Sequence, residues 1–133
     1  EYLNKLKELS KGLDVDFKEY KKDIRSDMRD VDIVILPSGK EEGLSRLIIE
    51  AMSTGKLVIA SDLKSNREAL GEDYSFLFMP GDYKTLASII DKIASNRNFL
   101  YELKNKLRKR AETLFDVRKN TKKIEKIYSF IAR

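Results

Sequence analysis

The chain of 133 residues contains no cysteine, no histidine and no tryptophan. Without cysteine it has no disulfide and no thiolate zinc site. Without histidine it has no nucleophile activated by an imidazole and no imidazole acid-base chemistry. Any chemistry within the chain therefore depends on carboxylates, Lys, Arg, Tyr and backbone groups.

Long apolar runs are also missing. No stretch reaches the roughly 20 apolar residues that span a bilayer, and no signal-peptide pattern opens the sequence. We therefore expect a cytoplasmic protein. The sequence begins at Glu1 and not at a methionine, which predicts that it belongs to a longer protein, and its length suits one small domain.

Charge is unevenly distributed within the net +5. Residues 1–95 carry 15 basic and 18 acidic side chains, whereas residues 96–133, the basic tail, carry 12 and 4. Such a tail is either a solvated helix surface or a contact for anionic partners such as a membrane face. Because aromatic side chains do not interleave with these charges as a stacking platform for bases would require, nucleic acid is not an expected partner.

Short apolar runs alternate with longer amphipathic ones. A run such as Asp32–Leu36, which is apolar without alternation, predicts a strand covered on both faces of a parallel sheet. The expected strands are Val15–Phe17, Asp32–Leu36, Leu57–Ser61 and Ser75–Phe78. Helices are expected over Ile24–Arg29 and Leu44–Thr54, before the first strand, and after each later one. This order predicts an α/β fold with a largely parallel sheet of about four strands flanked by helices.

Two of these helices carry start signals. Ser65 and Glu68 have the spacing of a capping box, which predicts that Ser65 precedes a short helix. Asp82 follows Pro80-Gly81 and is predicted to cap the next helix.

The segment PSGKEEGLSRLIIEAMSTGK, residues 37–56, leads from a strand into a helix and contains two acids eight positions apart, Glu42 and Glu50. Ligands of such sheets bind at the carboxyl ends of the strands, where free N–H groups of a helix start favour phosphate. Gly43 would let a phosphate approach the backbone closely. A continuous helix would place Glu50 about 12 Å beyond Glu42. The two acids would then hold the two ends of an elongated ligand with phosphate in its middle, such as a nucleotide sugar.

Each acid also has a simpler interpretation. Arg46 and Glu50 are four residues apart and suit an ordinary surface ion pair. Glu42 suits a solvated loop acid. Glu41 is out of register with both acids, and we expect it to face solvent.

The segment Glu42–Glu50 resembles the E-x7-E motif of retaining GT-B glycosyltransferases of the group 1 family. The segments DIVILPS, EAMSTGKLVIASD and FLFMPGDYKTLASII are similar to the carboxyl-terminal donor-binding domain of that family, over roughly residues 15–94. The resemblance implies an incomplete, Rossmann-like half of a GT-B fold. It divides the chain into a nucleotide-sugar-binding α/β core, residues 1–95, and basic carboxyl-terminal helices, residues 96–133.

The resemblance also implies roles for single residues. Glu42 would contact the donor sugar near the reacting centre, and Glu50 would accept hydrogen bonds from the ribose hydroxyls. Backbone amides of Gly43, Leu44 and Ser45 would approach the sugar and the pyrophosphate.

The implied reaction is sugar transfer with retention and without a metal or other cofactor, in bacterial polysaccharide or glycolipid synthesis. An amino-terminal domain absent from this chain would bind the acceptor. The basic tail is left with its two interpretations, a solvated surface or a contact with the inner membrane face. Two alternatives stay open: a non-catalytic nucleotide-binding module, and an interaction domain whose basic tail binds an anionic partner.

The family's sheet has the strand order 3-2-1-4-5-6, and the four expected strands match its strands 3, 4, 5 and 6. Without strands 1 and 2, the strand at Asp32–Leu36 has an open edge, which chains usually cover. We therefore expect that Val15–Phe17 moves in beside this strand or that a second copy of the chain covers it. We also expect that this chain alone does not catalyse sugar transfer.

Overall fold

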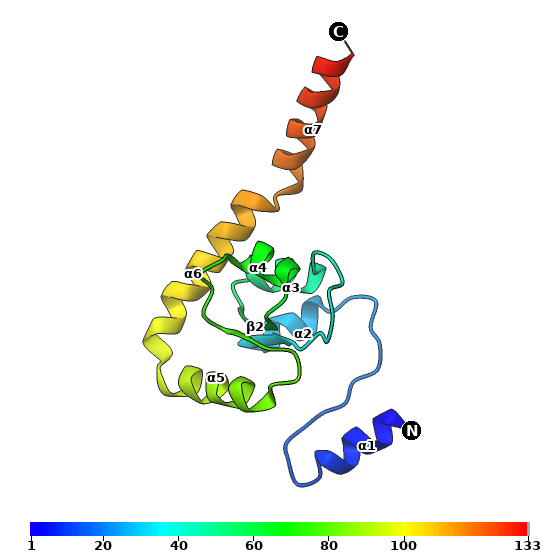
Figure 1. Cartoon of the computed structure of the whole chain (residues 1–133), viewed down its shortest axis with the longest axis vertical. Coiled ribbons are helices and arrows are strands. Elements are labelled where there is room, and N and C mark those ends of the chain that lie inside the picture. Colours follow the sequence, from blue (N-terminus) through cyan, green and yellow to red (C-terminus); the bar gives the residue numbers. More distant parts are fainter. Residues whose placement is uncertain (133) are drawn as a thin grey trace.

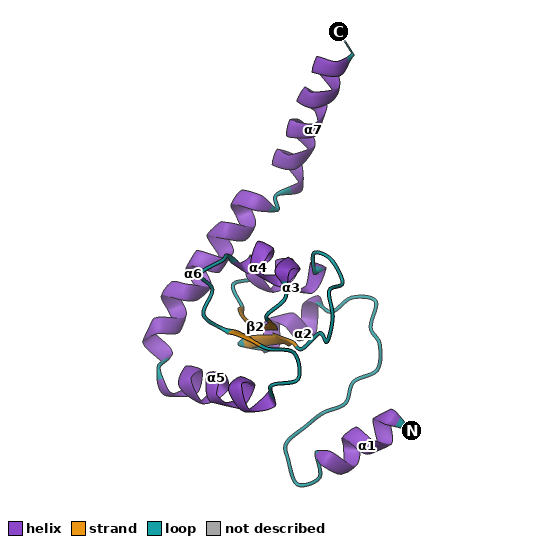
Figure 2. Cartoon of the chain, in the orientation of Figure 1, coloured by secondary structure: helices purple, strands orange, loops and turns teal. Residues whose placement is uncertain are grey.

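The structure is a computed structural model that describes residues 1–132, and for residues 97–99 it describes the backbone alone. The elements are shown in Figure 1 and coloured by type in Figure 2. In chain order they are α1 (Tyr2–Leu9), α2 (Arg25–Asp30), β1 (Ile33–Leu36), α3 (Arg46–Ser53), β2 (Leu57–Ser61), α4 (Lys64–Leu70), β3 (Leu77–Phe78), α5 (Tyr83–Ser95), α6 (Arg97–Leu114) and α7 (Val117–Ile131).

The strands form one parallel sheet in the order β1-β2-β3. Ile33 of β1 pairs with Leu57 of β2, and Ala60 of β2 pairs with Leu77 of β3. α3 connects β1 to β2 and α4 connects β2 to β3, as parallel neighbours require. The predicted α/β fold with a parallel sheet flanked by helices is confirmed, but the described residues form three strands and not four.

The strand predicted at Val15–Phe17 is the one that is wrong. These residues lie in the connection between α1 and α2, and 49% of Val15 and 38% of Phe17 is exposed. A strand is stable only beside a hydrogen-bonded neighbour, and no strand of the described chain lies next to this segment. Of the two expected ways to cover β1, the first, Val15–Phe17 beside it, is therefore wrong, because within residues 1–132 no strand pairs with the outer edge of β1. Coverage by a second copy of the chain stays a prediction.

The core is centred on β2 and α3. All five residues of β2 are buried, and Ile48 and Met52 of α3 are completely inaccessible to solvent. α3 packs against β1, β2, α4 and α6, while α5 packs against β3 and α6. Replacing a buried side chain such as Leu57 with alanine would cost about 2–5 kcal/mol of stability. The loops that follow β1 and β2 therefore stand on a rigid base.

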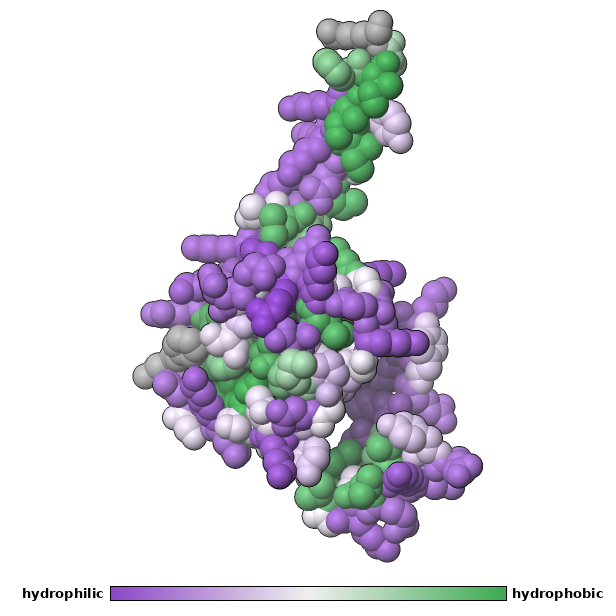
Figure 3. Space-filling view, in the orientation of Figure 1, coloured by the Kyte–Doolittle hydropathy of each residue, from purple (hydrophilic) through white to green (hydrophobic). Residues whose placement is uncertain are grey.

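Two helices project from this core. α1 lies apart from it at the amino end, and α7 extends away from it at the carboxyl end (Figure 1). Exposed apolar side chains form a stripe along α7 (Figure 3), and we call Ile124, Ile127, Tyr128 and Ile131 the α7 stripe. Among the described residues, no helix combines the length and the hydrophobicity that crossing a membrane requires.

The helix starts agree with the sequence at one place and differ at another. Asp82 caps α5 as predicted, because its carboxylate accepts hydrogen bonds from the Thr85 N–H at 3.0 Å and from the Thr85 hydroxyl at 2.6 Å. The capping box at Ser65 and Glu68 is wrong. α4 begins at Lys64, so Ser65 lies inside the helix, and the N-cap residue Leu63 has no side-chain acceptor to offer.

Candidate functional site

The candidate site lies at the carboxyl edge of the sheet, where β1 and β2 end side by side. The Ser61 hydroxyl at the end of β2 donates to the Leu36 carbonyl at the end of β1 at 3.4 Å. The side chain of Asn66, only 2% exposed, donates to the Ser61 carbonyl at 2.9 Å. Sequence reasoning missed Ser61 and Asn66, because their partners are set by the packing of the sheet. These bonds hold the starts of the two following loops together.

The loop after β1, residues 37–45, contains the predicted phosphate-binding backbone. Gly43 has φ of +77°, in the region that glycine adopts far more readily than other residues. A Cβ added there would meet no atom within 4 Å, so the requirement is conformational and the space beside Gly43 is open. Ser45 is the N-cap of α3, since its hydroxyl accepts from the Ile48 N–H at 3.5 Å. Leu44, between them, is exposed.

Glu42 lies in the loop and not on the helix. Together with Gly43, Ser45 and Ser65 it lines a cavity of about 100 Å³. Within the described part of the chain its carboxylate forms no hydrogen bond and no ion pair. Its charge is therefore available to a ligand in this cavity.

Glu41 connects the loop after β1 with the start of α4. Its carboxylate accepts hydrogen bonds from the backbone N–H of Lys64, the backbone N–H of Ser65 at 3.3 Å and the Ser65 hydroxyl at 2.6 Å. The bond from the Ser65 hydroxyl, with those from the two amides, holds the pKa of Glu41 below its ordinary value. Glu41 is exposed, as predicted, but its carboxylate also has hydrogen-bond partners, which lie 23 and 24 residues further along the chain.

Glu50 is on α3, one turn after Arg46, and lines a second cavity of about 600 Å³ beside residues 22–25. Arg46 Nη2 lies 3.4 Å from Glu50 Oε1, so the surface pair considered above exists. Its side chains are 91% and 43% exposed, respectively, which makes the pair worth only a few tenths of a kcal/mol. The helical spacing of 12 Å between Glu42 and Glu50 does not apply, since α3 begins only at Arg46. The two acids line separate cavities.

α4 is the wall of the small cavity opposite the loop, and charged groups hold it at both ends. Glu41 occupies its amino end. At its carboxyl end the Arg110 guanidinium, from α6, donates to the Ala69 carbonyl at 2.7 Å and to the Glu68 carbonyl at 2.9 Å. Arg67 binds Asp62 through two hydrogen bonds of 2.5 and 2.6 Å. A helix of seven residues is thereby fixed in place.

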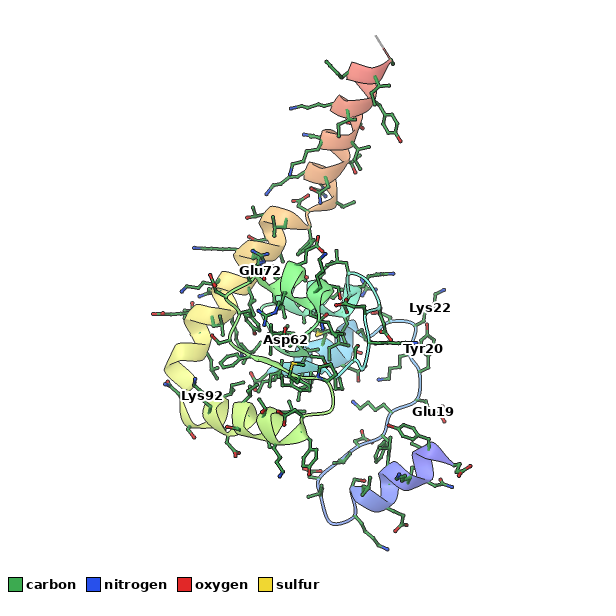
Figure 4. The ribbon with its side chains drawn as sticks, in the orientation of Figure 1. Glu19, Tyr20, Lys22, Asp62, Glu72 and Lys92 are labelled. Atoms are coloured by element: carbon green, nitrogen blue, oxygen red, sulfur yellow. The ribbon has the colours of Figure 1, made fainter. Side chains whose placement is uncertain are left out.

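Figure 4 locates several charged side chains relative to this site. Asp62 lies within the α/β core, whereas Glu19, Tyr20 and Lys22 project from the connection between α1 and α2. Lys22 belongs to the segment that lines the Glu50 cavity. Among the described residues, no group of three or more acidic side chains is arranged to hold a metal ion.

Some basic side chains of the tail form ion pairs or hydrogen bonds within the chain. Lys104 pairs with Asp32 at 3.1 Å, and Arg108 pairs with Glu112 at 3.0 Å. Lys119 donates to the Glu112 carbonyl at 3.0 Å. Lys106 and Lys109 of α6 are exposed, and so are Arg118, Lys122, Lys123 and Lys126 of α7, so accessible positive charge lies on both helices of the tail.

Several solved structures have a similar fold. Alr3699/HepE of Anabaena in complex with UDP-glucose is 27% identical to this chain with a TM-score of 0.85, and the match covers 96% of this chain and 36% of HepE. HepE in complex with UDP gives a TM-score of 0.87 with the same identity and coverage. The chain therefore spans about a third of the length of HepE.

A shorter relative matches a larger share of its own length. The C-terminal domain of LpcC, a glycosyl transferase group 1 family protein of Francisella tularensis, is 24% identical with a TM-score of 0.73. That match covers 87% of this chain and 63% of the LpcC domain, and at this identity it shows the fold alone. No curated protein sequence matches the chain significantly.

The class of the protein follows from the fold and the place of the site. Rossmann-like domains bind ligands at the carboxyl edge of a parallel sheet, and this chain places its glycine loop, the start of α3 and Glu42 at that edge. The sequence profile of the family described as glycosyl transferases group 1 matches residues 1–114. The chain belongs to this family, which confirms the resemblance noted in its sequence.

Proposed function

We propose that this chain is the donor-binding part of a glycosyltransferase that moves a sugar from a nucleotide sugar to an acceptor with retention. The observation that carries the proposal is an acid without a partner in the described chain, Glu42, next to Gly43 at the start of α3. This arrangement occurs in a fold whose neighbour HepE was solved with UDP-glucose and with UDP.

The roles of the loop residues follow from their positions. The backbone amides of Gly43, Leu44 and Ser45 precede α3, where its unpaired N–H groups and the positive end of its dipole favour a pyrophosphate. Ser45 adds the helix cap that fixes the first turn. Glu42, one residue before the glycine, meets the donor sugar. During transfer its negative charge stabilises the positive charge that develops at the anomeric carbon.

Glu50 would hold the other end of the donor. Its cavity of about 600 Å³ is larger than that of Glu42 and is bordered by residues 22–25 and by α3. A carboxylate accepts two hydrogen bonds from neighbouring hydroxyls, which suits a ribose. The donor would thus run from a nucleoside beside Glu50 to a sugar beside Glu42, with the pyrophosphate at the start of α3.

Transfer also requires parts that this chain does not supply. In the proposed reaction the bond between the anomeric carbon and the nucleoside diphosphate breaks, and an acceptor hydroxyl oxygen bonds to that carbon and releases its proton. No metal takes part. Residues 1–95 bind the donor, residues 96–133 form the basic carboxyl-terminal helices, and a separate amino-terminal domain binds the acceptor. The setting is the cytoplasm, in bacterial polysaccharide or glycolipid synthesis.

A second function, contact with an anionic membrane surface, is favoured by α7. The α7 stripe is exposed on one side of the helix. The exposed cations Arg118, Lys122, Lys123 and Lys126 lie on the remaining side, together with Glu125 and Phe130. An apolar face opposite a basic face is typical of helices that lie in a membrane interface. This contact would place the enzyme at the inner membrane face.

Titration with isotopically labelled protein distinguishes these functions. UDP and UDP-glucose are added to one sample, anionic phospholipid vesicles to a second, and RNA to a third, while the backbone amide resonances are followed. Donor binding predicts that UDP shifts the amides of Gly43, Leu44 and Ser45. If neither nucleotide shifts them at millimolar concentration, the donor-binding proposal is wrong. Shifts confined to α7, with vesicles or RNA alone, would favour an anionic-partner domain.

A further inference from the structure

α4 has an unusual N-terminal cap. The first N–H groups of a helix have no partner within it, and the residue that precedes the helix commonly supplies one. The N-cap of α4 is Leu63, whose side chain has no acceptor. Glu41 supplies the acceptors instead, from the loop after the neighbouring strand. The carboxylate thus joins the two loops that follow β1 and β2.

The same bonds fix the loop. Among the described residues, the Glu41 side chain forms the only hydrogen bonds that connect residues 37–44 with another element. The next two residues are Glu42 and Gly43. Ser65, the partner of Glu41, lines the same cavity as both. The position of the proposed sugar contact therefore depends on a carboxylate that does not line the cavity itself.

α4 depends less on Glu41 than the loop does. Arg110 holds the carboxyl end of the helix, Arg67 binds Asp62, and the buried Asn66 side chain is bonded to β2. Loss of the Glu41 carboxylate would leave these contacts in place. The loop of residues 37–44 would therefore gain more conformational freedom than α4.

The charge of Glu41 and its hydrogen bonds predict opposite effects of Glu41 on nucleotide binding. Glu41 carries a negative charge near the proposed pyrophosphate, and like charges repel. Neutralising it should therefore strengthen the binding of an anionic nucleotide, if charge alone mattered. If its hydrogen bonds to the start of α4 hold the loop in place, neutralising Glu41 should instead weaken nucleotide binding. The sign of the change in nucleotide affinity thus distinguishes a residue that acts by its charge alone from one that positions the loop.

We propose that Glu41 is a positioning residue for the donor site: by capping α4 it holds Glu42 and Gly43 where the donor binds. This proposal rests on the donor-binding function proposed above. The proposed role requires no contact between Glu41 and the ligand.

The test is the affinity for UDP, measured by calorimetry on the intact chain and on Glu41→Gln. Loss of one to two hydrogen bonds predicts about 2- to 10-fold weaker UDP binding by Glu41→Gln. Glu68→Gln is the matched control. It removes the same charge from α4, and its carboxylate has no hydrogen bond in the described chain. The control should bind UDP like the unmodified chain or slightly more tightly.

Ser65→Ala provides a second variant that removes a partner of Glu41 and keeps both backbone amides. The double variant combines Glu41→Gln with Ser65→Ala. If Glu41 acts through Ser65, its loss of UDP affinity should be smaller than the sum of the losses of the two single variants. Glu41→Asp, which keeps the charge, should recover part of the affinity. Thermal unfolding of each variant shows whether it is folded. If Glu41→Gln does not fold, Ser65→Ala and Glu41→Asp carry the test alone.

The outcomes are distinct. Unchanged or tighter UDP binding by folded Glu41→Gln overturns the positioning role and leaves donor binding intact. Fully additive losses in the double variant also overturn it. Absence of UDP binding by the unmodified chain refutes the donor-binding function, and the positioning role with it.

Discussion

Glu50 offers the sharpest test of the proposed donor site, because the structure gives it a competing explanation. The Arg46–Glu50 pair is exposed, so its loss should change the free energy of unfolding by only a few tenths of a kcal/mol. A carboxylate that accepts hydrogen bonds from a ribose contributes far more. Losing hydrogen bonds to a charged group costs about 1.5–3 kcal/mol, or about 10- to 150-fold in Kd. We therefore expect Glu50→Ala to weaken UDP binding by this factor while the protein stays folded.

The matched control is Arg46→Ala, which breaks the same ion pair from its other side. If Glu50 serves only the helix surface, the two variants should have equal, small effects on stability and none on UDP affinity. If Glu50 binds the nucleoside, Arg46→Ala should not reproduce the loss of affinity. Calorimetric titrations with UDP and thermal unfolding curves, both at one fixed salt concentration, provide the two measurements. UDP affinity of Glu50→Ala within about twofold of the unmodified chain would refute the assignment.

Three further predictions concern catalysis, packing and acidity. In an enzyme that contains this chain, Glu42→Gln should lower kcat more than donor affinity, because the attraction between the Glu42 carboxylate and the anomeric carbon strengthens in the transition state. A kcat equal to that of the unmodified enzyme would refute this role of Glu42. Arg110→Met should lower the free energy of unfolding in denaturant by about 1–2 kcal/mol, since two charge-assisted bonds to the end of α4 are lost; an unchanged midpoint would contradict this. Hydrogen bonds from Lys18 and Lys21 lower the pKa of Asp27 from 3.8 to about 2, so its stabilisation is present above pH 4 and is lost as the pH falls toward 2. Denaturation curves between pH 2 and pH 5 should show a smaller dependence on pH for Asp27→Asn than for the unmodified chain.

The sequence predicts best where a residue is determined by its immediate neighbours. The predicted strand Leu57–Ser61 has the limits of β2, because five consecutive apolar or small residues suit a strand buried on both faces of a parallel sheet. The predicted cap Asp82 is confirmed, and its partner Thr85 is only three residues away.

Predictions fail where the partner lies far along the chain. Glu41 has no local signal, because its three donors belong to α4 and reach it only after β1 and β2 have paired. Val15–Phe17 has the alternation of a strand but no neighbour to bond with in the described chain. The predicted start of α3, Leu44, is two residues early. Leu44 continues the apolar pattern of the helix, but the positive φ of Gly43 and the cap at Ser45 delay the helix to Arg46.

α7 extends away from the core that contains the sheet (Figure 1), so the α7 stripe lies apart from the edge of β1 that no strand of the described chain covers. This separation decides how copies of the chain can assemble. A contact of one β1 edge with another β1 edge is isologous, so it uses up both edges and closes as a dimer related by a twofold axis. A contact between the α7 stripe of one copy and the β1 edge of the next is heterologous. It leaves one free edge and one free stripe at the ends, and further copies can add in the same way. The symmetry of the first contact, and not its strength, therefore separates a particle of fixed mass from one that grows with concentration.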